Sequence, residues 1–361
     1  TTNGKVDRKA LMESTRDTHR QEEQSQPIRT TKEQIVAQVW QALFHRSDLQ
    51  ADSDFFLIGG DSLLATRCMG ELRKQGYQAD LTALFSHSTL SQFAASLIEM
   101  TADESSPLAP LIAQPSRRFL PFPMTEVQQA YWVGRQSGFA LGEISSQFFI
   151  EFRVEQLDVE RFNQAMNRLI QRHDMLRAVV RDHQQQVLIQ VPAFTLTCHL
   201  LDDIDGFQAN ALRDALAHQV KNSALWPLFT VEAVSASHGE ARIFVNLDNM
   251  MLDGLSMQIF FSELQAIYHN PDLALPELAI TFRDYVEWQQ QSVTEQTRAA
   301  AKKYWLQRLA DLPAAPALPL QSDPNQIHKP KFIRAAGSLS PQEWQALKKL
   351  AARHQVTPSA L

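Results

Sequence analysis

Two polar stretches interrupt this chain, and they limit how large any folded unit within it can be. Residues 14–29 consist mainly of polar and charged side chains and hold too few apolar ones to build a core. Residues 101–118 contain three prolines, and proline interrupts a helix because it lacks the backbone N–H that the helix needs. We therefore expect two linkers, with one compact unit over residues 30–100 and a second over residues 119–361.

Charge and cysteine content argue against several classes of partner and site. The net charge is −6 and both signs are interspersed, so neither nucleic acid nor a membrane surface is an expected partner. Cys68 and Cys198 lie far apart, which favours neither a disulfide framework nor a zinc site. No apolar run could span a bilayer, and we expect a cytoplasmic protein without a metal. Several histidines show no metal-ligand spacing: His173, His199, His218 and His238.

The shorter unit has the apolar spacing of an all-α, four-helix bundle. Its first helix is expected to follow Thr30, which has the capping-box spacing to Glu33. The second is expected from Asp61 or Ser62 to just before Gly76, a short turn follows near residues 83–85, and a last helix is expected after a cap at residue 89. Three apolar stripes predict the longer helices: Ile35, Val39 and Leu43; Leu64, Cys68 and Leu72; Leu90, Phe93, Ala94 and Leu97.

The longer unit alternates helix and strand patterns, which predicts an α/β layered fold. Residues 243–247 are nearly all apolar and indicate a strand buried on both faces. Asp158 is expected to cap a helix whose apolar face includes Phe162 and Leu169. Further strands are expected over residues 148–154, 178–180, 187–191, 194–200 and 229–234, and further helices over 125–133, 255–268, 282–290 and 299–309.

The most specific motif in the chain is DFFLIGGDSLLAT, over residues 54–66. Its two glycines permit a tight turn, and Asp61 and Ser62 then stand where a helix begins. Free amide N–H groups and the positive end of the helix dipole favour an anion there, such as a phosphodiester on Ser62. The alternative is that Asp61 or Ser62 serves only as a helix N-cap.

This motif, with the helices around it, resembles the signature of a peptidyl carrier protein over residues 30–100. The resemblance implies that a phosphopantetheinyl transferase attaches 4′-phosphopantetheine to Ser62 and that the thiol of this arm carries acyl or aminoacyl groups as thioesters. The run TNGKVDR at residues 2–8 resembles the closing motif of an adenylation domain, which implies a domain tail over residues 1–13 and an adenylation domain upstream as a partner. Lys5 would then correspond to the lysine that contacts the acyl-adenylate, although an Asn-Gly turn with solvated charges describes the segment equally well.

Several segments of the longer unit resemble heterocyclisation domains of nonribosomal peptide synthetases. They are FPMTEVQQAYWVGR at 122–135, RHDMLR at 172–177, DNMMLDGLS at 248–256 and LPAAPALPL at 312–320. The resemblance implies an incomplete N-terminal lobe of a two-lobed fold similar to chloramphenicol acetyltransferase. Residues 357–361 resemble the start of a further family motif, and the family's later Asp-Phe-Thr motif is absent from the chain.

The third of these motifs differs from that of ordinary condensation domains, which hold two adjacent histidines at this place. Alignment on Asp253 and Gly254 puts Asp248 and Asn249 at the histidine positions, so an imidazole cannot act there. Tuned carboxylates could instead orient a nucleophile or move protons, which makes Asp248 and Asp253 the candidate catalytic residues. For Asp253 we favour a structural role: a partly buried carboxylate that caps the next helix and pairs with Arg177. For Asp248 both roles stay open.

The resemblance implies a module in which the carrier donates its acyl group to the heterocyclisation domain. That domain would join the group to Cys, Ser or Thr on a downstream carrier protein and cyclodehydrate the product to a thiazoline or oxazoline, in siderophores of the yersiniabactin or pyochelin kind. An alternative is a carrier followed by a degenerate, docking-only lobe. An amide-forming condensation domain is disfavoured by the absent histidine pair.

Overall fold

The structure is a computed structural model, and it describes residues 27–100, 110–237, 239–314, 319–328, 330–333, 335 and 337–354. Residues 1–13, 14–26 and 101–109, to which we assigned an adenylation tail and parts of two linkers, lie outside this range, as do residues 357–361. The chain divides into two compact units: Thr1–Ser105 with Ala335–Leu361, and Ser106–Arg334.

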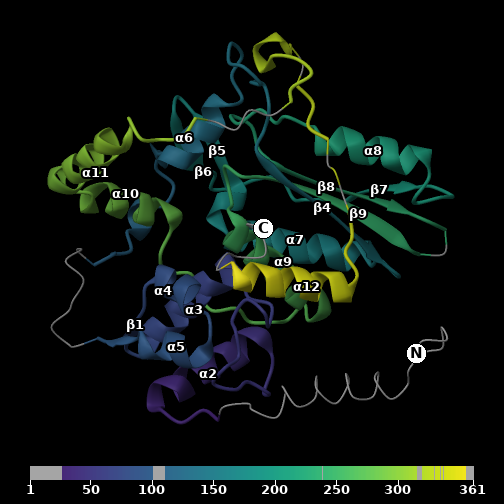
Figure 1. The fold of residues 1–361 in the computed structure, drawn as a ribbon. Helices are drawn as coiled ribbons and strands as arrows, with labels where there is room; N and C mark the ends of the chain where they lie inside the picture. The colour runs from purple at the N-terminus through teal and green to yellow at the C-terminus, as the bar shows by residue number, and fades with distance from the viewer. Residues whose placement is uncertain are drawn as a thin grey trace, which may run out of the picture. The chain divides into compact units, whose positions relative to one another are not determined.

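The first unit contains the expected helical bundle (Figure 1). Thr30 and Glu33 form the predicted capping box, and Gly76 has the positive φ of +83° that the sequence required after the second helix. Thr89 stands at an N-cap but makes no side-chain capping bond. The helices are α2 (Thr31–Phe44), α3 (Ser62–Lys74), α4 (Leu81–Ser86) and α5 (Leu90–Ala95), with a short antiparallel pair of β1 (Tyr77–Gln78) and β2 (Ile98–Glu99).

Aromatic packing forms the core of this bundle. Trp40, Phe55 and Phe93 are each fully buried, and the ring centroids of Trp40 and Phe55 lie 5.1 Å apart. The unit also includes α12 (Pro341–Arg353), where Lys348 Nζ donates to the Leu57 carbonyl at 2.7 Å. Helix α12 was not expected from the sequence.

The second unit is built on a four-stranded sheet in the order β4-β9-β8-β7 (Figure 1). β4 (Gln147–Val154) and β8 (Phe229–Ser235) pair antiparallel with β9 (Ala241–Asp248), and β7 (Thr197–Leu200) runs parallel to β8. α7 (Val159–Arg172) and α9 (Gly254–His269) pack on one face, and α8 (Phe207–Ala217) packs on the other. Because both faces of β9 are covered, four of the five residues over 243–247 are apolar, Asn246 being the exception.

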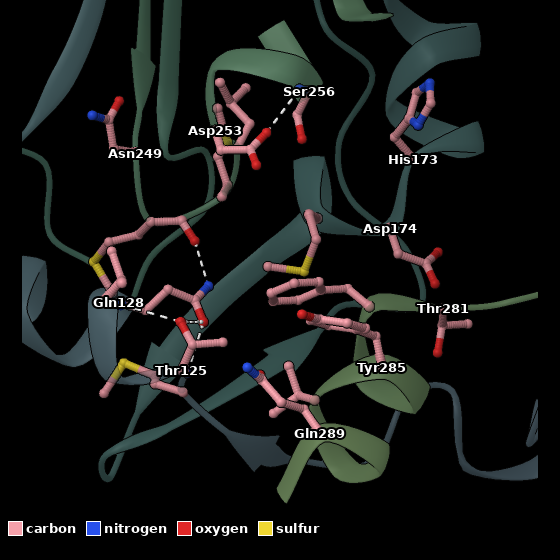
Figure 2. A pocket seen from close by; sticks show the side chains of 18 of the residues that line it. Thr125, Gln128, His173, Asp174, Asn249, Asp253, Ser256, Thr281, Tyr285 and Gln289 are labelled. Atoms are coloured by element: carbon pink, nitrogen blue, oxygen red, sulfur yellow. Dashed lines mark hydrogen bonds between the residues drawn. The ribbon is translucent and has the colours of Figure 1, made fainter. Parts of the chain in front are cut away.

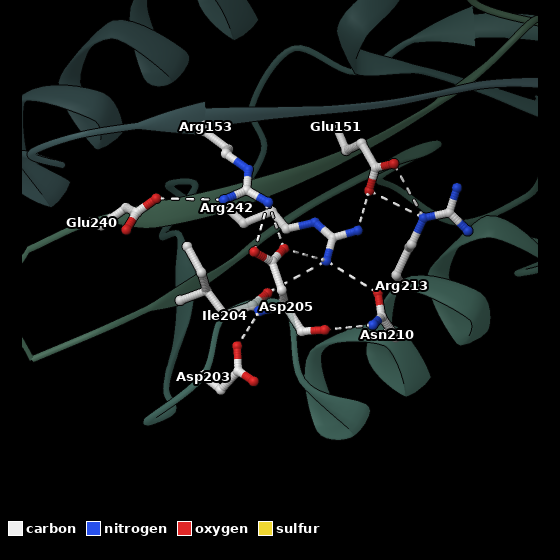
Figure 3. Close-up of polar contacts among 9 residues, drawn as sticks. All are labelled: Glu151, Arg153, Asp203, Ile204, Asp205, Asn210, Arg213, Glu240 and Arg242. Carbon is white, nitrogen blue, oxygen red and sulfur yellow. Dashed lines mark hydrogen bonds and ion pairs between the residues drawn. The ribbon is translucent and has the colours of Figure 1, made fainter. Parts of the chain in front are cut away.

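Charged residues fasten α8 and the loop before it to the sheet (Figure 3). Arg242 on β9 pairs with Glu151 on β4 at 2.7 Å, and Glu151 also accepts from Arg213 on α8 at 3.0 Å. Arg153 on β4 pairs with Asp205 at 2.6 Å. The face of the sheet that α8 covers therefore combines a small apolar cluster with an ionic network. The face that α7 and α9 cover is mainly apolar.

A smaller sheet in the order β3-β6-β5 contains a strand that we placed wrongly. Residues 187–191 were expected to form it, but β6 is Gln184–Val187. The reason is the two-residue turn at Asp182 and His183, both with positive φ, which pairs Arg181 with Gln184 and so sets the register. The other elements here are β3 (Phe122–Pro123), β5 (Ala178–Arg181), α6 (Glu126–Val133), α10 (Phe282–Ser292), α11 (Glu295–Arg308) and the 3₁₀ helices η1 (Pro115–Arg117), η2 (Asp174–Arg177) and η3 (Pro324–Gln326).

Candidate functional site

The loop before α3 is held by one carboxylate and one aromatic ring. Asp54 Oδ1 accepts hydrogen bonds from the backbone N–H groups of Phe56 and Leu57, both at 2.9 Å. Phe55 is fully buried, and a Cβ on Gly60 would lie only 2.3 Å from its ring. Gly59 has φ of +117°, which side chains disfavour. Both glycines are therefore required by the shape of the loop.

Asp61 is the N-cap of α3, and Ser62 is the first residue of the helix. Asp61 Oδ1 accepts from the N–H groups of Leu63 and Leu64 at 2.9 and 2.8 Å. The two roles that the sequence left open thus fall to different residues: Asp61 caps, and Ser62 stands at the positive end of the helix dipole, a position that suits a phosphodiester.

Helix α3 also contains a cysteine, Cys68, whose thiol is unreactive. Cys68 is fully buried, and burial raises the pKa of its thiol to about 12. At neutral pH this thiol is protonated and a poor nucleophile.

The second unit contains a cavity of about 1650 Å³ between the starts of α6 and α9 and helix α10 (Figure 2). Figure 2 shows the side chains that the main elements contribute. Asp253 and Ser256 come from the start of α9, Thr125 and Gln128 from the start of α6, and Tyr285 and Gln289 from α10.

Asp253 lies on the wall of this cavity and is exposed. It is the N-cap of α9, and its Oδ1 accepts from the Ser256 N–H at 2.8 Å, which confirms the predicted cap. The predicted burial and the predicted pairing with Arg177 are wrong. Arg177 instead pairs with Asp174 at 2.7 Å and donates to the Ile170 carbonyl at 2.9 Å. The reason is that Arg177 ends η2, the 3₁₀ helix that follows α7, and so reaches the free carbonyls at the end of α7.

Asp248 is the buried carboxylate of the motif. It ends β9, is 1% exposed, forms an ion pair with Arg135 and accepts from the Met250 N–H at 2.9 Å. Asp248 is not among the described residues that line the cavity. Nearby, burial lowers the pKa of Lys221 to about 8. Our sequence analysis missed Arg135 as the partner, although it closes the motif at residues 122–135.

Two further residues of the cavity wall were assigned no role from the sequence. Asn249, at the position of a histidine in ordinary condensation domains, donates from Nδ2 to Ser146 Oγ at 3.0 Å. His173 Nε2 lies 2.7 Å from Glu263 Oε2, and Arg172 pairs with the same oxygen at 3.0 Å. The position of His173 in the RHDMLR motif was the only sequence signal for a role of this residue. Its contact with Glu263 depends on the fold and could not be predicted.

Comparison with known proteins gives a family match for the region around Ser62 and another for the region that contains the cavity. Residues 34–97 match the phosphopantetheine attachment site family, and residues 121–361 match the condensation domain family. The chain belongs to the condensation domain family. It is a nonribosomal peptide synthetase sequence in which a carrier, with its phosphopantetheine attachment site, precedes a condensation domain. The family match runs to residue 361, whereas α12 makes contacts within the first unit.

Relatives of this synthetase sequence are much longer. It is 32% identical to bacitracin synthase 1 of Bacillus licheniformis, covering all of this chain and 7% of that protein. It is 33% identical to pyochelin synthetase PchE of Pseudomonas aeruginosa, covering 91% and 23%. The cyclization-docking bidomain of EpoB from Sorangium cellulosum superposes with a TM-score of 0.62 at 26% identity, covering 90% of this chain and 62% of that structure. In the described part of the synthetase chain, no helix has the length and apolar character to cross a membrane.

Proposed function

We propose that the carrier presents an acyl or aminoacyl group on Ser62 to a condensation domain that performs heterocyclisation. The domain would join this group to Cys, Ser or Thr on a downstream carrier protein and cyclodehydrate the product to a thiazoline or oxazoline. The DNMMLDGLS spacing supports this proposal, as do the names of a pyochelin synthetase and of a cyclization bidomain among the relatives. The pyochelin synthetase among these relatives favours a siderophore of the pyochelin kind as the product. Because the chain spans only part of each, these steps belong to the whole synthetase.

The side chains on the cavity wall of the condensation domain are the main structural support for this proposal. Asn249 stands there in place of a histidine, and an amide can orient a substrate but cannot take up a proton near neutral pH. Asp253 is one of the carboxylates on this wall, where it can accept a hydrogen bond from an attacking amine or side chain. Asp248, paired with Arg135, holds the turn and acts only through it.

The residues around Ser62 fit the phosphopantetheine arm, which supplies the thiol that bears the acyl group. The tight Phe55–Gly60 contact shapes the loop, and the start of α3 receives the phosphate. We expect a phosphopantetheinyl transferase with coenzyme A to add one arm to the chain. Ser62→Ala should abolish the mass gain in intact mass spectrometry while the helical circular dichroism signal stays unchanged. A mass gain that persists in Ser62→Ala would contradict the assignment.

The complete synthetase, loaded by its upstream adenylation domain, tests the second step. Product released from the downstream carrier should have lost one more water than the linear amide, as measured by mass spectrometry. A linear amide alone would indicate an ordinary condensation domain. Normal loading of both carriers without any bond formation would instead support the docking-only lobe.

A further inference from the structure

Two buried glutamines meet at the cavity wall, which Gln128 lines. Gln128 on α6 is 7% exposed and Gln185 on β6 is 1% exposed. Gln128 Nε2 donates to Gln185 Oε1 at 3.0 Å, and Gln185 Nε2 donates to Gln128 Oε1 at the same distance. The two side-chain amides therefore form a reciprocal pair, joined by two hydrogen bonds in an environment from which water is largely excluded.

Each amide has one N–H left, and each uses it to hold a backbone carbonyl. Gln128 Nε2 donates to the Met250 carbonyl at 2.6 Å (Figure 2), and Gln185 Nε2 donates to the Pro123 carbonyl at 2.9 Å. Gln128 Oε1 also accepts from the Thr125 N–H at 3.0 Å, as part of the capping box of α6. All four amide hydrogens of the pair thus have acceptors.

Met250 lies in the turn that joins the two carboxylates of the motif. The turn is held at its start by the buried Asp248–Arg135 ion pair and by the Asn249 N–H, which donates to the Ser146 carbonyl at 3.0 Å. The bond from Gln128 holds the same turn from the side of α6, three residues before Asp253 caps α9.

We propose that Gln128 and Gln185 are a positioning pair: Gln128 places the turn of Asn249 and Asp253 on the cavity wall, and Gln185 orients Gln128. This inference rests on the proposed function of that wall. Glutamine suits the task because its side-chain amide offers two donors and an acceptor at the end of one side chain. Glutamate has no donor when ionised, and asparagine is one methylene shorter.

Two isosteric variants separate positioning from simple loss of stability. Gln128→Glu removes both donors of residue 128, including the bond to the Met250 carbonyl. Gln185→Glu also removes two donors, but it keeps the acceptor for Gln128 and therefore leaves the bond to Met250 in place. The variants should lower the thermal midpoint of the synthetase similarly. In Gln128→Glu, we expect kcat for heterocycle formation to fall roughly tenfold or more, with KM for the acceptor substrate little changed; in Gln185→Glu, kcat should fall several times less.

The same assay in the complete synthetase gives the contrary outcomes. Equal kcat values in the two variants, or a kcat of Gln128→Glu equal to wild type, would overturn the positioning pair. If Gln128→Glu does not fold, Gln128→Met, which fills the same volume without a donor, is measured in its place with the same expectation. If wild type makes only the linear amide, heterocyclisation fails as the function, and the comparison is then made on the rate of amide formation.

Discussion

The turn before α3 and the turn before α9 both end in an aspartate that caps the next helix, but different interactions hold the two turns in place. In each, an aspartate caps the helix: Asp61 in the carrier and Asp253 in the condensation domain. The carrier turn is anchored by the buried ring of Phe55 against Gly60, which lies five residues away. The turn before α9 is anchored by Arg135 and Gln128, more than 100 residues away in sequence.

This difference follows what each turn must do. The carrier has to present one side chain for modification, and a local motif with apolar support is sufficient for that. The condensation domain has to hold several groups along the wall of a cavity, and such placement needs directional bonds from several elements. We therefore expect the second turn to be the more sensitive to loss of a single polar partner.

Asp248→Ala should have the largest effect. Removing this carboxylate leaves the Arg135 guanidinium, whose side chain is 5% exposed, buried without its partner, and such a change costs about 3–5 kcal/mol. The free energy of unfolding by denaturant measures this loss. Asp248→Asn, which keeps an acceptor for the Met250 N–H, should lose less. An unfolding midpoint of Asp248→Ala equal to wild type would show that the ion pair does not support the turn.

Gly60→Ala should have the next largest effect, and it tests the apolar anchor. Its Cβ would lie 2.3 Å from the Phe55 ring and 2.5 Å from the Phe55 carbonyl, so the loop must shift, at a cost of about 1–3 kcal/mol. We also expect slower modification of Ser62 by the transferase. Gly70→Ala in α3 is the matched control, because a Cβ there meets open space and alanine favours the helix. Similar stability of both variants would argue against the Phe55 anchor.

Asp253→Ala should have the smallest effect on folding, about 1 kcal/mol, because it removes an exposed N-cap. Asp253→Asn should keep the cap, since asparagine caps helices as well as aspartate does, but it removes the negative charge. Thermal unfolding and the rates of condensation and cyclisation separate the two roles. A slow but stable Asp253→Asn supports chemistry at the cavity wall. A fully active Asp253→Asn would leave Asp253 with the cap alone.

The sequence was a good guide wherever structure depends on neighbours along the chain. The carrier helices, the cap at Asp253 and the buried strand β9 follow from spacing and capping. It misled where burial decides, because we expected the buried, arginine-paired carboxylate at Asp253 and it is Asp248. Which arginine reaches a carboxylate depends on how distant segments pack.

Two other misses have related causes. Gln185 is polar and fully buried, so a hydrophobic pattern cannot reveal that β6 begins one residue before it. Helix α8 was not expected at all: it buries only Ala209 and Leu216, and its first residue, Phe207, is 89% exposed. Part of the contact between α8 and the sheet is ionic, through Glu151 and the two arginines that pair with it. Ion pairs of this kind leave no apolar periodicity in the sequence.

Under the proposed function, the burial of Cys68 protects the acyl group on the arm of Ser62. A thioester passes readily to any thiolate within reach, and Cys68 stands only six residues after Ser62. Burial raises the pKa of the Cys68 thiol to about 12, so the thiol stays protonated at neutral pH, and the residue is fully buried. Under the proposed function, the carrier helix can therefore contain a cysteine that does not take the acyl group from the arm.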